Sequence, residues 1–317
     1  MTGTGNQPSG WQKDTWADNI APCACLGTCA LPQNTGPDGA IHVMLNEAQI
    51  KQYRAEGYVA PIPVMSRDAA LGIRRQLEKF EATQGGQLKT AQRSRAYLLF
   101  EWLDQLIHDP RVLDPVEQLI GPNILCWSST FWIKEAGSKS FADWHQDNTY
   151  WGLSSRNVLT AWFAISDASE EAGCMSVIPR THLGETLEHE DTYHQDNMLT
   201  RGQRIKNLDK SHAVAMPLRA GEMSLHNYCL AHGSGPNTSA DRRIGVSLHF
   251  MPPQTRQIVG AWDCATLVRG EDNFHHFTLA PRPRFDMDPV CVAFQEKAAL
   301  AMREVLYAGA TQNPARL

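Results

Sequence analysis

The sequence predicts an α+β fold, a double-stranded β-helix (a jelly-roll, cupin-like barrel) flanked by N-terminal and C-terminal helices. Apolar residues recur at helical spacing between residues 45 and 120, and again over residues 289–307. After Gly121, short runs rich in β-branched and aromatic residues alternate with Gly, Pro and Asn, as strands alternate with turns. Helices followed by many short strands are typical of an α+β protein whose strands close as a jelly roll.

The helical part follows a leader. Residues 1–40 are rich in Gly, Pro, Asn, Thr and Cys and show no period. We therefore expect an irregular or partly disordered leader, followed by a single domain over residues 41–317. Asn46 and Gln49 resemble a capping box, which predicts a helix that starts there and ends at Gly57.

Three more helices are predicted in the first third. Residues 66–80 carry apolar side chains at Ala69, Ile73, Leu77 and Phe80, which is a helical spacing. Residues 98–107 repeat the pattern, and residues 115–120 form a short helix with Pro115 near its start.

The strand-rich part contains five clear runs, which are residues 124–133, 159–165, 175–178, 222–226 and 244–250. Residues 181–212 are polar and carry little periodicity. An insertion of this length is often a lid or a binding loop, and we expect a lid here.

Composition excludes several classes of protein. The chain has 317 residues, 42% hydrophobic and 20% charged, so it is neither disordered nor collagen-like. Its net charge is −5 and it has no basic block, which argues against a nucleic-acid or anionic-membrane partner. There is no apolar run of about 18 residues and no secretory signal, so the cytoplasm is the expected compartment.

The eight cysteines fall into two groups. Five are scattered, mostly in apolar contexts, and are expected to be small buried hydrophobes: Cys126, Cys174, Cys229, Cys264 and Cys291. The other three, Cys23, Cys25 and Cys29, form a C-x-C-x3-C cluster that could bind a metal. No second Cys/His pair follows at zinc-finger spacing, which favours incidental thiols instead.

An H-x-D triplet is the strongest chemical signal. In an extended segment, residues i and i+2 point to the same face, so His145 and Asp147 could hold one metal ion from the same side. The triplet occurs three times, since His189/Asp191 and His194/Asp196 also fit. Those two lie in the polar insertion and are expected to be solvated loop charges, because metal ligands need rigid support. His145 instead lies between two predicted strands.

A distant histidine would complete a facial triad and leave positions open on an Fe(II) ion. His226 and His232 are both candidates. His232 is favoured by the residues on its C-terminal side, Gly233-Ser234-Gly235 and then Arg243, because a guanidinium can bind a carboxylate in a bidentate fork. Arg243 starts an alternating run on one face of a strand, whereas Arg242 would point away, to solvent or a salt bridge.

These residues resemble the phytanoyl-CoA dioxygenase family of Fe(II)/2-oxoglutarate-dependent oxygenases, over about residues 45–285. The resemblance rests on residues 144–147 (WHQD), 160–162 (TAW), 173–182 (GCMSVIPRTH), 220–222 (AGE) and 232–243. The family usually has P-G-S-H where this chain has residues 179–182 (PRTH), and G-D where it has Gly221-Glu222. Neither departure touches an expected ligand.

The resemblance implies a set of site residues. The metal ligands would be His145, Asp147 and His232, and Arg243 and Ser234 would hold 2-oxoglutarate. Trp162 matches a pocket tryptophan, although a plain core position fits it equally well. Gln146 and Thr130 are weaker carry-overs to the cosubstrate site. The implied reaction consumes 2-oxoglutarate and O2, releases succinate and CO2, and hydroxylates an unactivated C–H bond.

Within the family, residues 147–153, 197–203 and 269–272 are similar to stretches of syringomycin-type chlorinating enzymes and phosphonate hydroxylases. A halogenase has Ala or Gly in place of the carboxylate ligand, which opens a metal position for chloride. Asp147 fills that position, so the resemblance implies hydroxylation.

The substrate is less defined. We expect a small, polar metabolite such as a phosphonate, an amino acid or a natural-product intermediate. The alternatives are a substrate tethered to a carrier protein or CoA, and a barrel that binds metal without turnover. Lys89, Arg93, Arg95 and Lys134 could bind an anionic substrate, although solvated surface charge is the more common role of such residues.

Overall fold

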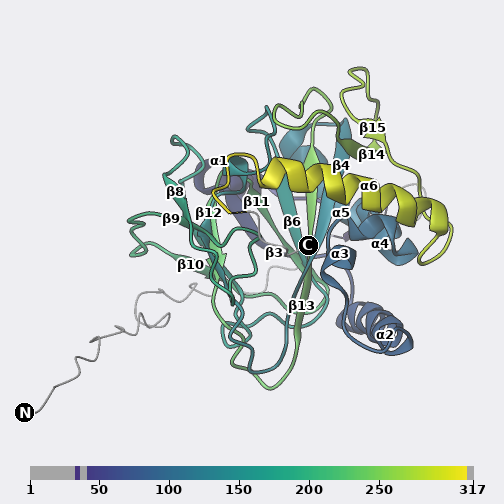
Figure 1. Ribbon diagram of the computed structural model, residues 1–317, viewed down its shortest axis with the longest axis horizontal. Helices are drawn as coiled ribbons and strands as arrows, with labels where there is room; N and C mark the ends of the chain where they lie inside the picture. The colour runs from purple at the N-terminus through teal and green to yellow at the C-terminus, as the bar shows by residue number, and fades with distance from the viewer. Residues whose placement is uncertain (1–32, 36–40, 313–317) are drawn as a thin grey trace, which may run out of the picture.

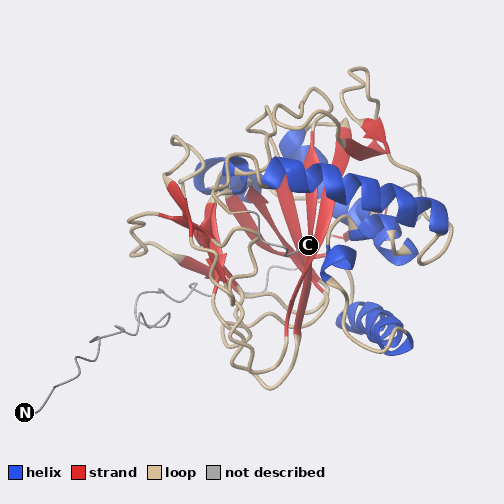
Figure 2. Cartoon of the chain, in the orientation of Figure 1, coloured by secondary structure: helices blue, strands red, loops and turns tan. Residues whose placement is uncertain are grey.

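The computed structural model describes residues 33–35 and 41–312. Most of the expected leader, with Cys23, Cys25 and Cys29, lies outside these residues. Helices and two facing β-sheets make up the described part, which confirms the α+β class (Figure 2). The helices are α1 (Glu47–Glu56), α2 (Arg67–Thr83), α3 (Thr90–Arg93), η1 (Ala96–Leu98), α4 (Glu101–Ile107), α5 (Pro110–Ile120) and α6 (Pro289–Leu306).

The large sheet has seven strands. Their order is β15 (Thr278–Leu279), β14 (Cys264–Arg269), β4 (Ile124–Lys134), β13 (Arg243–Met251), β6 (Leu159–Ala164), β11 (Glu222–Asn227) and β3 (Tyr58–Pro63). All neighbours are antiparallel except β14 and β15. In Figure 1 α6 crosses in front of this sheet.

The small sheet has the strand order β10 (Val214–Met216), β7 (Met175–Ile178), β12 (Ala231–Ser234) and β5 (Ala142–His145), all antiparallel. Two further pairs complete the described strands: β1 (Gln33–Thr35) with β2 (Ile41–Val43), and β8 (His189–Asp191) with β9 (Gln203–Ile205). The small sheet carries both His145 and His232, on its neighbouring strands β5 and β12.

Local signals set several helix ends. Asn46 and Gln49 form the predicted capping box of α1, and Gly57 ends the helix at a φ of 88°. Ser66 caps α2, within the range predicted to be helical. The prediction for α5 was wrong at its start, because the helix begins at Pro110 and is capped by Asp109. A proline is favoured at that first position, where its missing N–H costs nothing.

The main apolar core lies between the large sheet and the helices. Leu77 of α2, Leu103 of α4 and Val116 of α5 are fully buried in the same cluster as Val246 and Leu248 of β13. Each such side chain contributes about 1.5–3 kcal/mol by leaving water. Because strand side chains alternate, the residues between them face the other way, toward the small sheet. Packing of the core therefore aims the remaining face of β13 into the space between the sheets.

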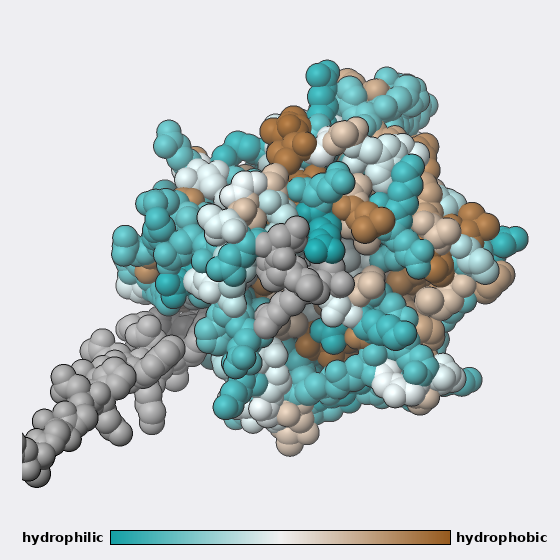
Figure 3. All heavy atoms as spheres, viewed as in Figure 1, coloured by the Kyte–Doolittle hydropathy of each residue, from teal (hydrophilic) through white to brown (hydrophobic). Residues whose placement is uncertain are grey.

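The five scattered cysteines are all buried and unpaired, as predicted. On the face shown in Figure 3 hydrophilic residues predominate, and hydrophobic ones form small separate patches. Within the described ranges, no helix combines the length and apolar character needed to cross a membrane.

Candidate metal centre and cosubstrate cavity

Three predicted ligands converge between the sheets. His145 ends β5, and Asp147 follows at the start of a single 3-10 turn, η2 (Asp147–Thr149). β12 places His232 directly opposite His145 in the antiparallel register. One donor atom from each of the three side chains lies within 4.8 Å of the others, and no other such group of three occurs among the described residues. The H-x-D triplet and the distal histidine therefore meet as the sequence predicted.

Backbone contacts orient both imidazoles. Nδ1 of His145 lies 2.8 Å from the carbonyl oxygen of Asp143, and Nδ1 of His232 lies 2.9 Å from that of Leu230. A carbonyl only accepts, so each Nδ1 must carry the proton and each Nε2 keeps its lone pair. The two Nε2 atoms lie 3.3 and 3.9 Å from the carboxylate oxygens of Asp147. This orientation by second-sphere carbonyls is typical of metal-binding histidines.

Burial sets the charge of this group. It lowers the pKa of His145 and of His232 to about 4, and it raises the pKa of Asp147 to about 6. At neutral pH the site therefore consists of two neutral imidazoles and one carboxylate, the protonation state in which these side chains bind a metal. Two nitrogens and one oxygen on one side of an ion match the facial arrangement of non-heme Fe(II) sites.

Gln146 lies between the two ligands but faces away from the cavity. Its Nε2 donates to the carbonyl oxygen of Cys229 at 2.6 Å, and its Oε1 accepts from the backbone N–H of Leu187 at 2.8 Å. Both ends of the buried amide are thus engaged by backbone. The structure places Gln146 as a brace behind the ligands rather than as a contact of the cosubstrate.

The two other H-x-D triplets stay apart from the metal group. His194 is exposed, as expected. The prediction for His189 was wrong, because this residue is half-buried in β8 rather than solvated. Its Nε2 accepts from the backbone N–H of Gln146 at 3.0 Å, and its Nδ1 lies 2.7 Å from the carbonyl oxygen of Leu187. The first part of the 181–212 insertion therefore packs directly behind the ligand turn, while its role as a lid stays a prediction.

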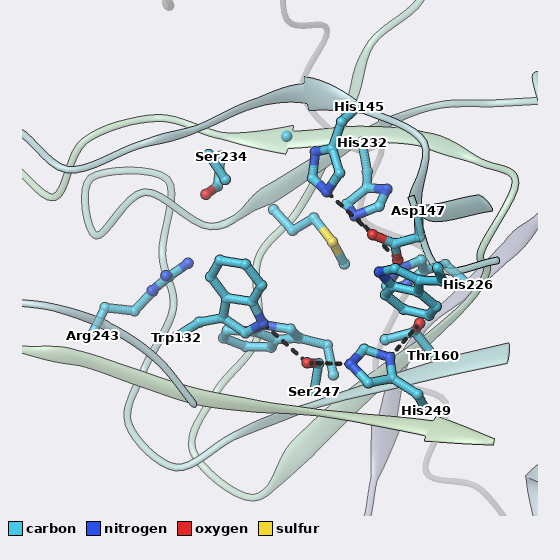
Figure 4. Close-up of a pocket in the computed structure, with 15 residues that line it drawn as sticks. Trp132, His145, Asp147, Thr160, His226, His232, Ser234, Arg243, Ser247 and His249 are labelled. Carbon is cyan, nitrogen blue, oxygen red and sulfur yellow. Dashed lines mark hydrogen bonds and ion pairs between the residues drawn. The ribbon is translucent and has the colours of Figure 1, made fainter. Parts of the chain in front are cut away.

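Arg243 lies at the opposite end of the cavity from the metal group (Figure 4). It is 2% exposed, its Nη1 donates to the carbonyl oxygen of Gly173 at 2.9 Å, and its guanidinium lies 5.3 Å from the ring centre of Trp162. Its Nε has no hydrogen-bond partner. Ser234 lines the same end. Arg242 points the other way and pairs with Glu81 at 2.8 Å, as the strand alternation predicted.

A glycine makes room for Trp162. A Cβ on Gly245 would stand 2.0 Å from Cζ2 of the indole, which no real side chain can do. Gly245 lies on the cavity face of β13, between Arg243 and Ser247. The absent side chain thus leaves room for the indole beside the strand, where the guanidinium of Arg243 lies over its ring.

The other predicted residues do not line the cavity. Thr130 lies opposite Ser247 in the register but stays outside the lining. Arg95 is fully buried and pairs with Asp263 at 2.5 Å, so its charge is not available to a substrate. Arg93 is half-buried, and its Nε donates to the carbonyl oxygen of Leu88 at 3.3 Å. Lys134 is also buried, and its Nζ donates to Ser234 Oγ at 2.7 Å, just behind the cavity wall.

A polar wall faces the metal group, and apart from His226, the less favoured candidate for the distal ligand, its residues had no predicted role. His249 lies 3.1 Å from both Thr160 Oγ1 and Ser247 Oγ, and Trp132 Nε1 donates to the same Ser247 Oγ at 3.0 Å. His226 completes this wall, and neither of its ring nitrogens has a partner. The alternation that begins at Arg243 does place Ser247 and His249 on its face, so part of the signal was present.

Three comparisons agree with this geometry. The family model for phytanoyl-CoA dioxygenase matches residues 38–245, more than half of the chain. The probable alpha-ketoglutarate-dependent hypophosphite dioxygenase of Stutzerimonas stutzeri is 27% identical over 196 residues, which are 60% of this chain and 68% of that protein. The peroxisomal phytanoyl-CoA dioxygenase of Bos taurus is 31% identical over 146 residues, so the match spans only 43% of its length and 44% of this chain.

Among solved structures, the apo form of ThoJ, a non-heme monooxygenase, superposes with a TM-score of 0.72 at 28% identity, and covers 82% of this chain and 98% of that chain. The overall arrangement of helices and sheets is thus shared with a structurally characterised relative. The chain belongs to the phytanoyl-CoA dioxygenase family and is an Fe(II)- and 2-oxoglutarate-dependent dioxygenase.

Proposed function

We propose that this enzyme hydroxylates an unactivated C–H bond of a small, polar metabolite, with its two sheets forming a double-stranded β-helix around the site. The observation that carries the proposal is the carboxylate of Asp147, which stands beside both imidazoles at 3.3 and 3.9 Å. A carboxylate in this third position leaves no ligand site for chloride. Hydroxylation is therefore favoured over chlorination.

In this proposal His145, Asp147 and His232 hold the Fe(II). When bound, the metal supplies the oxidising chemistry, with O2 and 2-oxoglutarate as cosubstrates. The protein's contribution is to present three ligands from one side and to keep both histidines neutral. Bracing by Gln146 fixes the turn that connects two of the ligands.

Arg243 is proposed to bind the distal carboxylate of 2-oxoglutarate. Its guanidinium is buried, faces the cavity and lacks a carboxylate partner among the described residues. The ring of Trp162 packs against the guanidinium, and Ser234 offers a hydroxyl at the same end of the cavity. The cosubstrate would thus extend from the metal group to Arg243.

The remaining wall supports a polar substrate recognised without a cation. His226, His249 and Thr160 are neutral polar groups, since burial lowers the pKa of His249 to about 3 and that of His226 well below its usual value. Arg243 is the one cationic side chain that lines the described cavity. Substrate oxygens or nitrogens would accordingly meet hydrogen-bonding groups rather than an ion pair.

Replacing Asp147 with Ala tests the ligand assignment. We expect no hydroxylated product from D147A, and weaker Fe(II) binding, measured by titration without O2 in chloride-free buffer. Asp196→Ala, in a triplet away from the site, is the matched control and should behave as wild type. A chlorinated product from the wild-type enzyme in chloride buffer would refute the hydroxylase proposal.

A succinate-release screen addresses the substrate. Its arms are phosphonates, amino acids, quaternary amines, natural-product intermediates and acyl groups on a carrier protein or CoA. Hypophosphite is added because the S. stutzeri relative is named for it. Release stimulated only by tethered acyl groups would replace the small metabolite by the carrier-bound alternative.

A further inference from the structure

A second buried basic side chain stands behind the Arg243 end of the cavity. Lys134 lies opposite Arg243 in the register of β4 and β13 and is 1% exposed. Its Nζ donates to Ser234 Oγ at 2.7 Å, to the carbonyl oxygen of Gly173 at 3.3 Å and to that of Gly235. Arg243 donates to the same Gly173 oxygen at 2.9 Å. The two basic side chains therefore share a backbone acceptor.

Neither basic side chain has an anionic partner. No carboxylate oxygen lies within 4.0 Å of the charged nitrogens of Lys134 or Arg243 in the described part of the chain. The titratable and charged groups that act on Lys134 are Arg243 and the thiol of Cys174. Burying two like charges together is costly unless an anion joins them. A ligand carboxylate at this end would supply that anion.

The contact with Ser234 gives Lys134 a way to act on the cavity. An arriving carboxylate favours the protonated form of Lys134. That form has three N–H donors and no lone pair, so Ser234 Oγ must accept from it. The hydroxyl proton of Ser234 is then free, and no other described hydrogen bond uses it. Ser234 lines the cavity on the side of Arg243 (Figure 4). The proton can therefore be donated to a ligand placed there.

We propose that Lys134 is a positioning residue for the cosubstrate, which turns the Ser234 hydroxyl proton toward the distal carboxylate and adds a second positive charge beside Arg243. This inference rests on the proposed roles of Arg243 and Ser234. It assigns to a buried lysine a part in selecting 2-oxo acids that carry a second carboxylate. Lys134 itself stays behind the wall and does not contact the reacting atoms.

The test compares two ligands that differ in one carboxylate. Affinities of the Fe(II)-loaded protein for 2-oxoglutarate and for 2-oxopentanoate, which lacks the distal carboxylate, are measured by calorimetry without O2. Lys134→Met is expected to weaken 2-oxoglutarate by about tenfold and 2-oxopentanoate by less than twofold. The exposed Lys139, changed to Met, is the matched control and should alter neither affinity.

An equal loss for both ligands would show a merely structural role and overturn the proposal. Should K134M fail to fold, Lys134→Gln keeps polar donors without the charge and is judged by the same ratio. Arg243→Met separates the cosubstrate site from the role of Lys134. If R243M keeps the wild-type preference for 2-oxoglutarate, the proposed cosubstrate site is wrong. If R243M loses it while both Lys134 variants keep it, only the role of Lys134 falls.

Discussion

Two arginines, Arg95 and Arg243, are both almost fully buried, but their guanidinium groups have different partners. Arg95 is 0% exposed and pairs with Asp263 at 2.5 Å, and further donates to backbone carbonyls of Trp127 and Cys264. Arg243 is 2% exposed, with one carbonyl contact and no carboxylate. Burial opposes the charge of Arg95, but Cys264 and Asp263 raise its pKa above the usual value, whereas burial lowers the pKa of Arg243 to about 10.

The difference separates charges that serve the fold from charges that serve a ligand. A buried cation with its own carboxylate is complete within the protein. One without a carboxylate costs stability until an anion arrives, and such a cost is expected at a binding site. The two histidines of the cavity wall differ in a similar way. His249 has two hydrogen-bond partners, whereas neither ring nitrogen of His226 has one.

The largest expected effect comes from removing each guanidinium. Arg95→Met leaves the buried Asp263 with hydrogen bonds but no cationic partner, so the free energy of unfolding should fall by about 3 kcal/mol. Arg243→Met removes an unpaired charge and should leave that free energy unchanged or higher. Urea denaturation of the two variants measures this contrast directly.

Ligand binding should show the reverse order. R243M is expected to weaken 2-oxoglutarate binding by at least about 30-fold, which corresponds to about 2 kcal/mol for a buried charged hydrogen bond. R95M, assayed where it is still folded, should bind within about twofold of wild type. The comparison breaks if R243M unfolds as easily as R95M, because Arg243 would then be a structural residue too.

The sequence predicted the elements that local patterns determine. The capping box at Asn46, the amphipathic α2 and the alternation of β13 are each written within one segment. The short strands β3, β5 and β12 escaped prediction, because their hydrogen bonds come from strands far away in the chain. A strand of four residues carries too little pattern to be recognised alone.

The site residues also fall into those that local sequence patterns identify and those that only the folded chain brings together. His145, Asp147 and His232 could be found because spacing and a family resemblance point to them. The state of Arg95 could not, since its partner Asp263 lies far along the chain and only folding brings them together. The bracing role of Gln146 was missed for the same reason. His226 was considered only as an alternative metal ligand, and its place in the cavity wall without a hydrogen-bond partner was not foreseen.

A smaller effect should follow from filling the space beside Trp162. Gly245→Val would place its side chain where the indole of Trp162 now lies, because a Cβ at this position would be 2.0 Å from Cζ2 of the ring. The indole must move and Arg243 loses its support, so 2-oxoglutarate affinity should fall by about tenfold, with a stability loss of about 1–3 kcal/mol from overpacking. Calorimetry and thermal unfolding together measure the two effects. Unchanged affinity would show that Arg243 keeps its position without the indole.

His249 and His226 allow the same comparison between a structural and a ligand-facing group, because both are neutral. His249→Phe breaks the contacts with Thr160 and Ser247 and leaves the buried Thr160 hydroxyl without a hydrogen bond, so it should cost about 1–3 kcal/mol of unfolding free energy. His226→Phe breaks no hydrogen bond and should cost less than about 0.5 kcal/mol. Because the wall is proposed to face the substrate, H226F should nevertheless lower substrate-stimulated succinate release. Equal stability losses in the two variants would remove the distinction.

The smallest expected effect is the uptake of a proton when 2-oxoglutarate binds. Burial and the neighbouring guanidinium lower the pKa of Lys134 to about 6, so near pH 7.5 the ligand-free enzyme holds it mainly as the neutral amine. A carboxylate beside Arg243 favours the ammonium form and raises that pKa. Binding of 2-oxoglutarate should then take up a fraction of a proton, at most one. Its affinity should also decrease as pH rises above 6.

Calorimetry in two buffers with different ionisation heats measures this uptake. Cys174 does not compete at pH 7.5, since burial raises the pKa of its thiol to about 11, and Arg243 stays charged with a pKa of about 10. Lys134→Met should therefore abolish the difference between the buffers, whereas Lys139→Met should keep it. Equal uptake in wild type and K134M would mean that another group takes the proton. In that case the anion needed at the Arg243 end does not act on Lys134.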